Sequence, residues 1–380
     1  MSDVAARRPV RSLLPGVALT LSSAVITLGV LEAGFRLAAW SADRRTFERA
    51  IGESVRPPAG SVAPLGRLIR PSANPRIVYE LWPGLDLRFE SLPGERCRVR
   101  TSRAGFRDRD YATPKPPGTF RIVGIGDSLM FGWGVDDGQD FLSVLEERLA
   151  RERPRSRIEV LNTAVPGYNT VMEVETLREK GLPYGPDLVV VGFCPNDASL
   201  PNFIRPVRDV WSLRSSFLLD FVRSRLRGAP PSGDALVFAP RRADDRAYED
   251  DPERVPQRYR PLAGWSALRG ALRELRSLSE GHGFGVVVTA FVPGFADERK
   301  RRGLDLAAQE GFPVLDFGEE EKRYLESHGI GEYVGSPLTV SAADPHPSAL
   351  AHAMAAEVLL RFLTEDPSLA ARLGRQAGPP

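Results

Sequence analysis

The chain has 380 residues, of which 42% are hydrophobic, 26% charged and 8% aromatic, which excludes a disordered or collagen-like protein. Its 51 basic residues nearly balance 49 acidic ones, so nucleic-acid binding has no electrostatic basis. With 2 Cys and 4 His, it lacks the side chains for a disulfide framework or a typical zinc site. We therefore predict no nucleic-acid partner, no metal and no cofactor.

The first predicted element is a membrane-spanning helix over residues 13–40, after a short tail of residues 1–12. Residues 13–31 carry no charge, follow three Arg, and are long enough to cross a hydrocarbon core of about 30 Å. Trp40 would suit the membrane interface. A cleaved signal peptide has the same basic and apolar regions and stays an alternative, although no clear cleavage site follows the apolar run.

The orientation of this span is not decided by its flanking charges, because Arg residues stand on both sides of it. A short internal tail with the bulk of the chain outside is the usual arrangement for a single N-terminal span, and we adopt it. The Arg7–Arg8 pair fits a twin-arginine export signal poorly, because Pro9 follows it directly. The predicted location is the membrane, single-pass, with the main part extracytoplasmic.

After the span, residues 41–118 are rich in Pro, Gly and Arg and predict a linker followed by a small strand-rich segment. From residue 119 onward, apolar β-branched runs alternate with helical periodicity. The predicted buried strands are 120–126, 158–162, 187–193, 285–292 and 313–317. A final helix follows Pro347, and residues 367–380 are a C-terminal tail. This alternation implies an α/β fold with a parallel sheet of about five strands and helices on both faces.

One long insertion, residues 199–261, interrupts this alternation. It holds an amphipathic segment over residues 213–226 and then a loop rich in Pro and charge. So long a loop in a compact domain is either disordered or a functional lid. We expect it to influence substrate selectivity, so that deletion of residues 228–260 changes substrate preference and leaves the fold intact.

Polar residues of catalytic type follow the predicted strands, where a parallel sheet places its ligand crevice. The first strand ends in Gly126-Asp127-Ser128, and the third is followed by Pro195-Asn196-Asp197. Asn162 ends the second strand, with Gly167 beyond it, and Asp344-Pro345-His346 precedes the last helix. Acyl transfer needs such parts: a hydroxyl nucleophile, a base, a carboxylate to orient the base, and donors for an oxyanion.

Four segments carry a family resemblance: GIGDSLMFGWGV, NTAVPGYNT, VVVGFCPNDA and DPHPSALAHAMAAE. In order and spacing they resemble the four blocks of SGNH (GDSL-type) hydrolases, over about two-thirds of the chain. The chain looks most similar to membrane-anchored bacterial members, in which a strand-rich segment ending like RTSRAGFRDRDY precedes the catalytic domain. The resemblance implies a three-layer α/β/α, flavodoxin-like catalytic domain over residues 119–366.

The resemblance also implies the site residues. Ser128 matches the nucleophile, at a strand-to-helix turn that would place helix-terminal N–H groups behind it. Gly167 and Asn196 match the oxyanion-hole residues, together with the Ser128 backbone N–H. His346 matches the general base and Asp344 its partner, although most members space these two as Asp-x-x-His and this chain has Asp-x-His.

Each of these residues also has a structural interpretation. Ser128 could cap a helix, Pro166-Gly167 is a turn signal by itself, and Asn196 could close an Asx turn. Asp127 is interpreted as a structural hydrogen-bonding residue. Packing or surface roles are expected for the remaining histidines, His282, His328 and His352.

The predicted function is a serine esterase with a Ser-His-Asp triad, acting on an ester in the cell envelope or outside the cell. The partner would be an ester-bearing small molecule, a lipid or an acylated glycan. Two alternatives use the same fold: an O-acetyltransferase on a cell-envelope polysaccharide, and a non-catalytic envelope binding module. A dinucleotide site at Gly124-Ile125-Gly126 is rejected, because Leu129 replaces the third glycine of that fingerprint.

Overall fold

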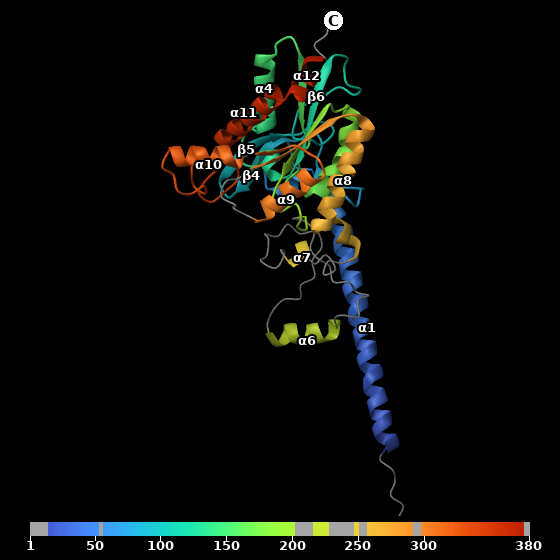
Figure 1. Ribbon diagram of the computed structural model, residues 1–380. Coiled ribbons are helices and arrows are strands. Elements are labelled where there is room, and N and C mark those ends of the chain that lie inside the picture. The colour runs from blue at the N-terminus through green and yellow to red at the C-terminus, as the bar shows by residue number, and fades with distance from the viewer. Residues whose placement is uncertain are drawn as a thin grey trace, which may run out of the picture. The chain divides into compact units, whose positions relative to one another are not determined.

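The computed structural model describes residues 14–52, 56–201, 216–227, 247–250, 257–291 and 298–375. The chain divides into two units, which are described separately (Figure 1). The helical unit is Met1–Arg49 with Val207–Ala235, and the main unit is Ala50–Pro206 with Leu236–Pro380. The predicted tail 1–12 and most of the segment 228–260 lie outside the described residues, so the predicted lid lies outside them as well.

The helical unit contains α1 (Leu14–Gly52) and α6 (Phe217–Arg227). Within α1, Gly16–Ser41 is long and apolar enough to cross a membrane, and none of its most apolar window is buried. The helix differs from the prediction at its end, because it continues to Gly52 through the first part of the predicted linker. Residues 42–51 contain neither Pro nor Gly, so no residue there breaks the helix.

The predicted strand-rich segment is present in the main unit. Its strands are β1 (Val62–Ala63), β2 (Ile69–Pro71), β3 (Tyr79–Leu81), β4 (Asp86–Leu92) and β5 (Glu95–Arg100), with the short helix α2 (Leu65–Leu68). β1, β4 and β5 form one small sheet, and β2 and β3 form another. Apolar residues alternate along β4 and β5 because only one face is covered, and Leu87, Phe89, Cys97 and Val99 are buried.

The main sheet has five parallel strands in the order β10-β9-β8-β6-β7. They are β6 (Thr119–Gly126), β7 (Arg157–Asn162), β8 (Leu188–Phe193), β9 (Gly285–Ala290) and β10 (Val314–Asp316). All five predicted strands are therefore confirmed, but β10 is a half-buried edge strand instead of a fully buried one. The strand order reverses between β6 and β8, which is the position where doubly wound sheets place their ligand crevice.

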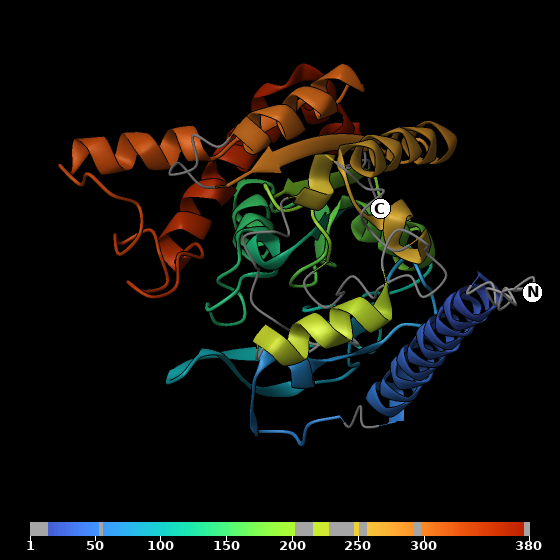
Figure 2. The same ribbon diagram turned by 90° about the horizontal axis from the view of Figure 1, so that it is seen from below.

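Two helical layers cover this sheet, as predicted. Val190 and Val287 contribute to the core under α4 (Phe141–Glu152) and α11 (Ala349–Glu365). Their neighbours along the same strands face the core under α5 (Thr170–Thr176), α8 (Trp265–His282) and α9 (Glu298–Gln309). Figures 1 and 2 show α11 and α8 on opposite sides of the sheet.

The remaining helices are short or lie at the periphery: α3 (Ser128–Phe131), α7 (Ala247–Asp250), α10 (Gly318–Ser327) and α12 (Pro367–Arg375). Helix α12 occupies most of the predicted C-terminal tail and contributes Leu373 to the core. The amphipathic segment predicted in the insertion corresponds to α6. The residues of the strand-rich segment share a core with α4 and α11, so they pack directly on the domain that follows them.

Candidate active site

Ser128 lies immediately beyond the carboxyl end of β6, at the start of α3. The side chain of Asp127 accepts a hydrogen bond from the Leu129 N–H at 2.9 Å and so fixes the turn, which is the structural role interpreted from the sequence. Helix α3 is a single turn that ends at Phe131. The strand-to-helix turn expected at Ser128 is present, and the first N–H groups of this short helix follow the serine.

The glycines of this block have a packing role. A Cβ at Gly124, Gly126 or Gly192 would come within 2.7–3.0 Å of the Met130 side chain. These glycines let α3 lie directly against β6 and β8, and Met130 is fully buried there. The Gly124-Ile125-Gly126 sequence thus serves helix-to-strand packing, which agrees with the rejection of a dinucleotide site.

His346 lies opposite Ser128, in a short loop before α11. Its Nε2 is 3.0 Å from the Ser128 Oγ, and its Nδ1 is 2.6 Å from Asp344 Oδ1. The backbone N–H of His346 also donates to Asp344 Oδ1, at 3.1 Å. The shorter Asp-x-His spacing is therefore compatible with contact between the two side chains.

The hydrogen bonds at Asp344 define how the imidazole is oriented. Burial raises the pKa of Asp344, but donation from His346 and from Trp133 more than offsets this and leaves the pKa below its usual value. An ionised Asp344 accepts a hydrogen bond from the N–H at His346 Nδ1. The proton of the neutral imidazole therefore stays on Nδ1, and Nε2 is the acceptor that faces the Ser128 hydroxyl. This is the orientation that a general base needs.

Trp133 is a site residue that sequence reasoning missed. Its Nε1–H donates to the second oxygen of Asp344 at 2.8 Å, and its ring stacks on the His346 ring with centroids 4.9 Å apart. The indole thus contacts both the acid and the base. In the sequence, Trp133 is marked by its position between two glycines, in the same segment as Ser128.

The loop that carries Trp133 is held by Arg107, from the strand-rich segment. The Arg107 guanidinium donates to the carbonyls of Phe131 at 2.7 Å and Val135 at 2.6 Å, and also to that of Gly132. Only 2% of the Arg107 side chain is exposed. Gly132 has a φ of +84°, and a Cβ there would lie 2.8 Å from Arg107 Nη1, so this close approach requires glycine.

Gly167 and Asn196 flank Ser128 on the two neighbouring strands. Gly167 follows β7 with a φ of +81°, and Asn196 follows β8; both are buried. Because β7 and β8 both pair with β6, the two loops lie on either side of the Ser128 turn. Asn196 Nδ2 donates to Asp127 Oδ2 at 3.4 Å, a long bond. Their oxyanion roles stay predictions.

A buried carboxyl group lies behind these loops. Glu173, on α5, is 1% exposed, and neither of its oxygens has a hydrogen-bond partner in the described part of the chain. Burial, with the charges of Asp197 and Asp127, raises the pKa of Glu173 well above its usual value. Burial at this position therefore favours the protonated, uncharged form of Glu173.

The other histidines have the packing and surface roles that were expected. His352 is fully buried on α11 between Phe141 and Phe291, and burial lowers its pKa to about 3. His282 ends α8, and His328 is exposed at the end of α10. Among the described residues, no group of three or more His, Cys, Asp or Glu is placed to hold a metal ion.

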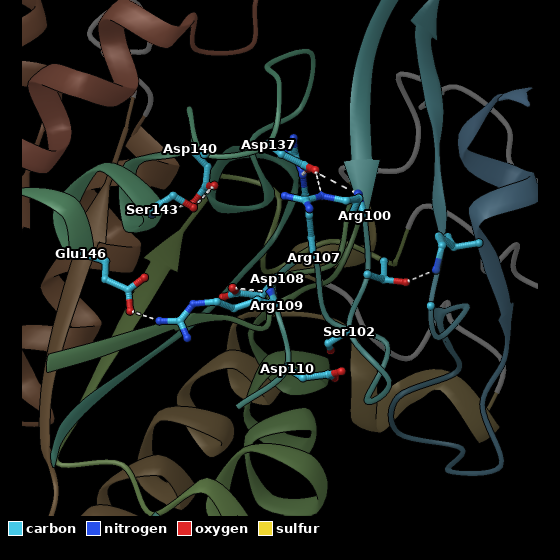
Figure 3. Close-up of a pocket in the computed structure, with 14 residues that line it drawn as sticks. Arg100, Ser102, Arg107, Asp108, Arg109, Asp110, Asp137, Asp140, Ser143 and Glu146 are labelled. Atoms are coloured by element: carbon cyan, nitrogen blue, oxygen red, sulfur yellow. Dashed lines mark hydrogen bonds and ion pairs between the residues drawn. The ribbon is translucent and has the colours of Figure 1, made fainter. Parts of the chain in front are cut away.

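A cavity of about 490 Å³ lies between the strand-rich segment and the start of α4, and its lining does not include Ser128, Asp344 or His346 (Figure 3). Its charged residues pair with one another: Arg109 donates to Glu146 at 2.6 Å, and Arg100 to Asp137 at 2.6 Å. Burial raises the pKa of Asp108, in this cavity, to about 7. The paired charges indicate a structural junction.

A comparison with protein families now identifies the class of this chain. The model of the GDSL-like lipase/acylhydrolase family matches residues 125–354. The chain belongs to this family and is a hydrolase that acts on ester bonds. No curated protein matches the chain.

Solved structures show the same general likeness at low identity. TesA is 18% identical, covers 64% of this chain and 98% of its own, and has a TM-score of 0.38. An acetyl xylan esterase from Geobacillus stearothermophilus is 14% identical, with coverages of 65% and 95% and a TM-score of 0.40. A putative lipolytic protein of the G-D-S-L family from Desulfitobacterium hafniense DCB-2 is 15% identical, with coverages of 64% and 99% and a TM-score of 0.36.

Proposed function

We propose that this protein is a serine esterase that works by two-step acyl transfer, with Ser128, His346 and Asp344 as its triad. The observation that carries the proposal is the continuous hydrogen-bonded path from Ser128 Oγ to His346 Nε2, at 3.0 Å, and from His346 Nδ1 to Asp344, at 2.6 Å. A nucleophile, a base and an orienting acid in this geometry are the parts that acyl transfer requires.

In the first step, His346 Nε2 takes the Ser128 proton as Oγ attacks the carbonyl carbon of the ester. The N–H groups of Ser128 and Gly167 and the Asn196 amide stabilise the oxyanion. The tetrahedral intermediate then collapses, and the proton on His346 passes to the leaving alcohol. In the second step, His346 takes a proton from water as the water oxygen attacks the acyl carbon. The bond between that carbon and Ser128 Oγ then breaks, His346 returns the proton to Oγ, and the acid leaves.

The substrate is proposed to be an ester of the cell envelope or the exterior, carried by a small molecule, a lipid or an acylated glycan. This rests on the Gly16–Ser41 segment, which is proposed as a single membrane span with the main unit extracytoplasmic. If a sugar hydroxyl replaced water in the second step, the same residues would act as an O-acetyltransferase. Acid release and acyl transfer to added polysaccharide are separable by product analysis.

The test is hydrolysis of p-nitrophenyl acetate and longer esters by the full-length protein in detergent, alongside Ser128→Ala. Loss of the nucleophile is expected to lower kcat by about 10⁴-fold or more. Ser277→Ala is the matched control, because Ser277 is exposed on α8 and its hydroxyl donates to the Arg273 carbonyl of the same helix. Equal turnover by wild type and Ser128→Ala would rule out the serine mechanism.

A further inference from the structure

The Arg107 and Trp133 contacts connect the strand-rich segment to the catalytic acid. Arg107 follows β5 and donates hydrogen bonds to three backbone carbonyls of the 131–135 loop. Trp133, in that loop, donates a hydrogen bond to Asp344. From these contacts, which build on the proposed triad, we infer that Arg107 and Trp133 are positioning residues that fix Asp344 and His346 in the orientation needed for catalysis.

The geometry explains why two residues are needed. Asp344 has two carboxylate oxygens, and His346 occupies only Oδ1. The indole N–H of Trp133 occupies Oδ2, so the carboxylate cannot rotate without losing a charge-assisted hydrogen bond. Trp133 also stacks on His346, so a shift of the 131–135 loop would move the indole and, with it, the imidazole of His346.

Arg107 suits this task because a guanidinium offers a planar set of donors. Its bonds to the Phe131 and Val135 carbonyls span the loop on both sides of Trp133. On the other side of the loop, a Cβ at Gly134 would lie 2.7 Å from Val340, at the base of the loop that carries His346. The Trp133 loop is therefore clamped between the strand-rich segment and the His346 loop.

The first test compares Trp133→Phe with wild type. Phenylalanine keeps an aromatic ring against His346 and removes the N–H donor together with the five-membered ring of the indole. The expected result is a kcat lowered by about 10- to 100-fold, the effect of one charge-assisted hydrogen bond. The acidic limb of kcat/KM should move to higher pH, because Asp344 without this donor holds a protonated His346 more strongly.

Trp82→Phe is the matched control. Trp82 lies in the strand-rich segment, and its indole N–H has no hydrogen-bond partner in the described part of the chain. Its replacement should leave kcat and the pH profile within about twofold of wild type. An unchanged kcat and pH profile for Trp133→Phe, in an enzyme that Ser128→Ala inactivates, would overturn this inference and leave the esterase proposal standing.

The second test joins the two residues in a double-mutant cycle. Arg107→Met should lower kcat and move the acidic limb in the same direction as Trp133→Phe, and Arg107→Lys should recover part of the loss. If both residues act on Asp344, the double variant should be little worse than the more impaired single variant. The link between Arg107 and Trp133 would be overturned if the loss of kcat in the double variant equalled the product of the two single losses. It would also be overturned if the folded Arg107→Lys variant lost activity while the acidic limb of its pH profile stayed in place.

A second inference comes from the helical unit and is independent of the first. The Glu32 carboxylate, on α1, accepts hydrogen bonds from the backbone N–H groups of Phe217 at 3.0 Å and Leu218 at 2.9 Å, so it caps α6. The Phe35 and Phe221 rings pack 4.7 Å apart. These contacts fix the start of α6 to α1 directly after the uncharged stretch 13–31, and Figure 1 shows α6 running across the direction of α1.

Two faces of α6 are apolar. Phe217 and Phe221, one turn apart, lie toward α1. Leu219, Val222 and Leu226 lie on the other side and are 55%, 43% and 81% exposed. Arg223 and Arg225 are exposed on either side of this second stripe, as the 100° step of a helix predicts.

We propose that this Leu219–Val222–Leu226 stripe lies in the headgroup region of the same membrane that α1 crosses. The proposal rests on the proposed membrane span, with the uncharged residues 13–31 crossing the hydrocarbon core and Glu32 at its boundary with the headgroups. A helix that runs across a spanning helix, at the end of its uncharged stretch, lies in the plane of the interface. Its apolar stripe then enters the lipid.

The test places a fluorescent label at Leu226→Cys in the full chain, with Cys97 and Cys194 replaced by Ala, reconstituted into vesicles that contain phosphatidylserine. We expect quenching by a nitroxide near the headgroup to exceed quenching by one near the bilayer centre. Arg276→Cys, exposed on α8, is the control and should not be quenched. Val25→Cys marks the span and should be quenched most by the central nitroxide.

The outcomes separate the possible failures. A quenched Val25→Cys label with an unquenched Leu226→Cys label would overturn the α6 proposal and keep the span. Two unquenched labels would overturn both. A Leu226→Cys signal that changes with protein dilution, but not with nitroxide lipid, would show that a second copy of the chain covers the stripe, and would also overturn the proposal.

Discussion

Residues 56–118 and residues 119–375 of the main unit contribute to the site in different ways. The second region supplies Ser128, Asp344 and His346, all from loops at the edge of the main sheet. The first region supplies none of the triad. It binds backbone carbonyls next to the site, through Arg107 on the 131–135 loop and through Tyr79, whose hydroxyl donates to the Pro166 carbonyl at 2.9 Å.

The residues proposed to react and the residues that hold them in position therefore come from separate parts of this chain. Loops at strand ends place reactive groups close together, but such loops are the least restrained parts of an α/β fold. Here the strand-rich segment restrains them from outside, because its side chains reach the carbonyls of two of the loops beside Ser128.

The largest effect is expected where the sheet-edge loops supply the chemistry. Asp344→Asn keeps the size of the side chain, but its amide cannot orient the imidazole in the same tautomer. We expect kcat to fall by about 10³- to 10⁴-fold with little change in the melting temperature. Asp305→Asn, exposed on α9, is the control for the loss of one carboxylate. Near-normal turnover by Asp344→Asn would remove Asp344 from the triad.

A smaller effect is expected at a histidine of the same region that has no place in the chemistry. Burial holds the pKa of His352 near 3, with smaller contributions from Arg107 and His346, so the folded protein keeps this imidazole neutral. The unfolded chain takes up the proton below about pH 6.5. Stability from this group is therefore complete above that pH and is lost progressively as the pH falls toward 3.

His352→Leu removes this pH dependence. At about pH 5 we expect a relative gain of about 2 kcal/mol, or about 3 °C in melting temperature, compared with the same substitution at about pH 8. Melting curves at the two pH values measure it, and His328→Leu, at an exposed position, should show no such difference. An equal effect of His352→Leu at both pH values would contradict the neutral buried imidazole.

The smallest effect is expected in the strand-rich segment. Tyr79→Phe removes the hydroxyl that donates to the Pro166 carbonyl, next to Gly167. We expect a loss of about 1–2 kcal/mol in unfolding free energy and a kcat lowered by a few-fold. Tyr333→Phe is the matched control, because Tyr333 is buried but its hydroxyl has no partner in the described residues. Equal results for the two tyrosines would mean that the segment restrains Gly167 by other contacts.

Most of the second region could be predicted from sequence, and the reason is local. Strands that are buried on both faces must be continuously apolar, as residues 188–193 are, and polar residues directly after such strands indicate the crevice. The position of β10 at the sheet edge was missed because its neighbours are set by topology, which a five-residue run does not encode.

The supporting contacts could not be predicted in this way. Arg107 stands among other charged residues, where an arginine is usually exposed, and only the folded chain shows it buried against three carbonyls. The contact between Trp133 and Asp344 joins residues that are far apart in sequence and follow no periodicity. Long-range hydrogen bonds of single side chains leave no repeating pattern, so sequence reasoning has nothing to detect.

The Gly132-Trp133-Gly134 loop has a consequence for how this enzyme can diversify. Both glycines have positive φ, and a Cβ on either would lie within 2.8 Å of a neighbouring side chain. A side chain at Gly132 would displace Arg107, and one at Gly134 would displace Val340. Substitution of either glycine is therefore expected to disturb the contact of Trp133 with Asp344 before it opens any new space.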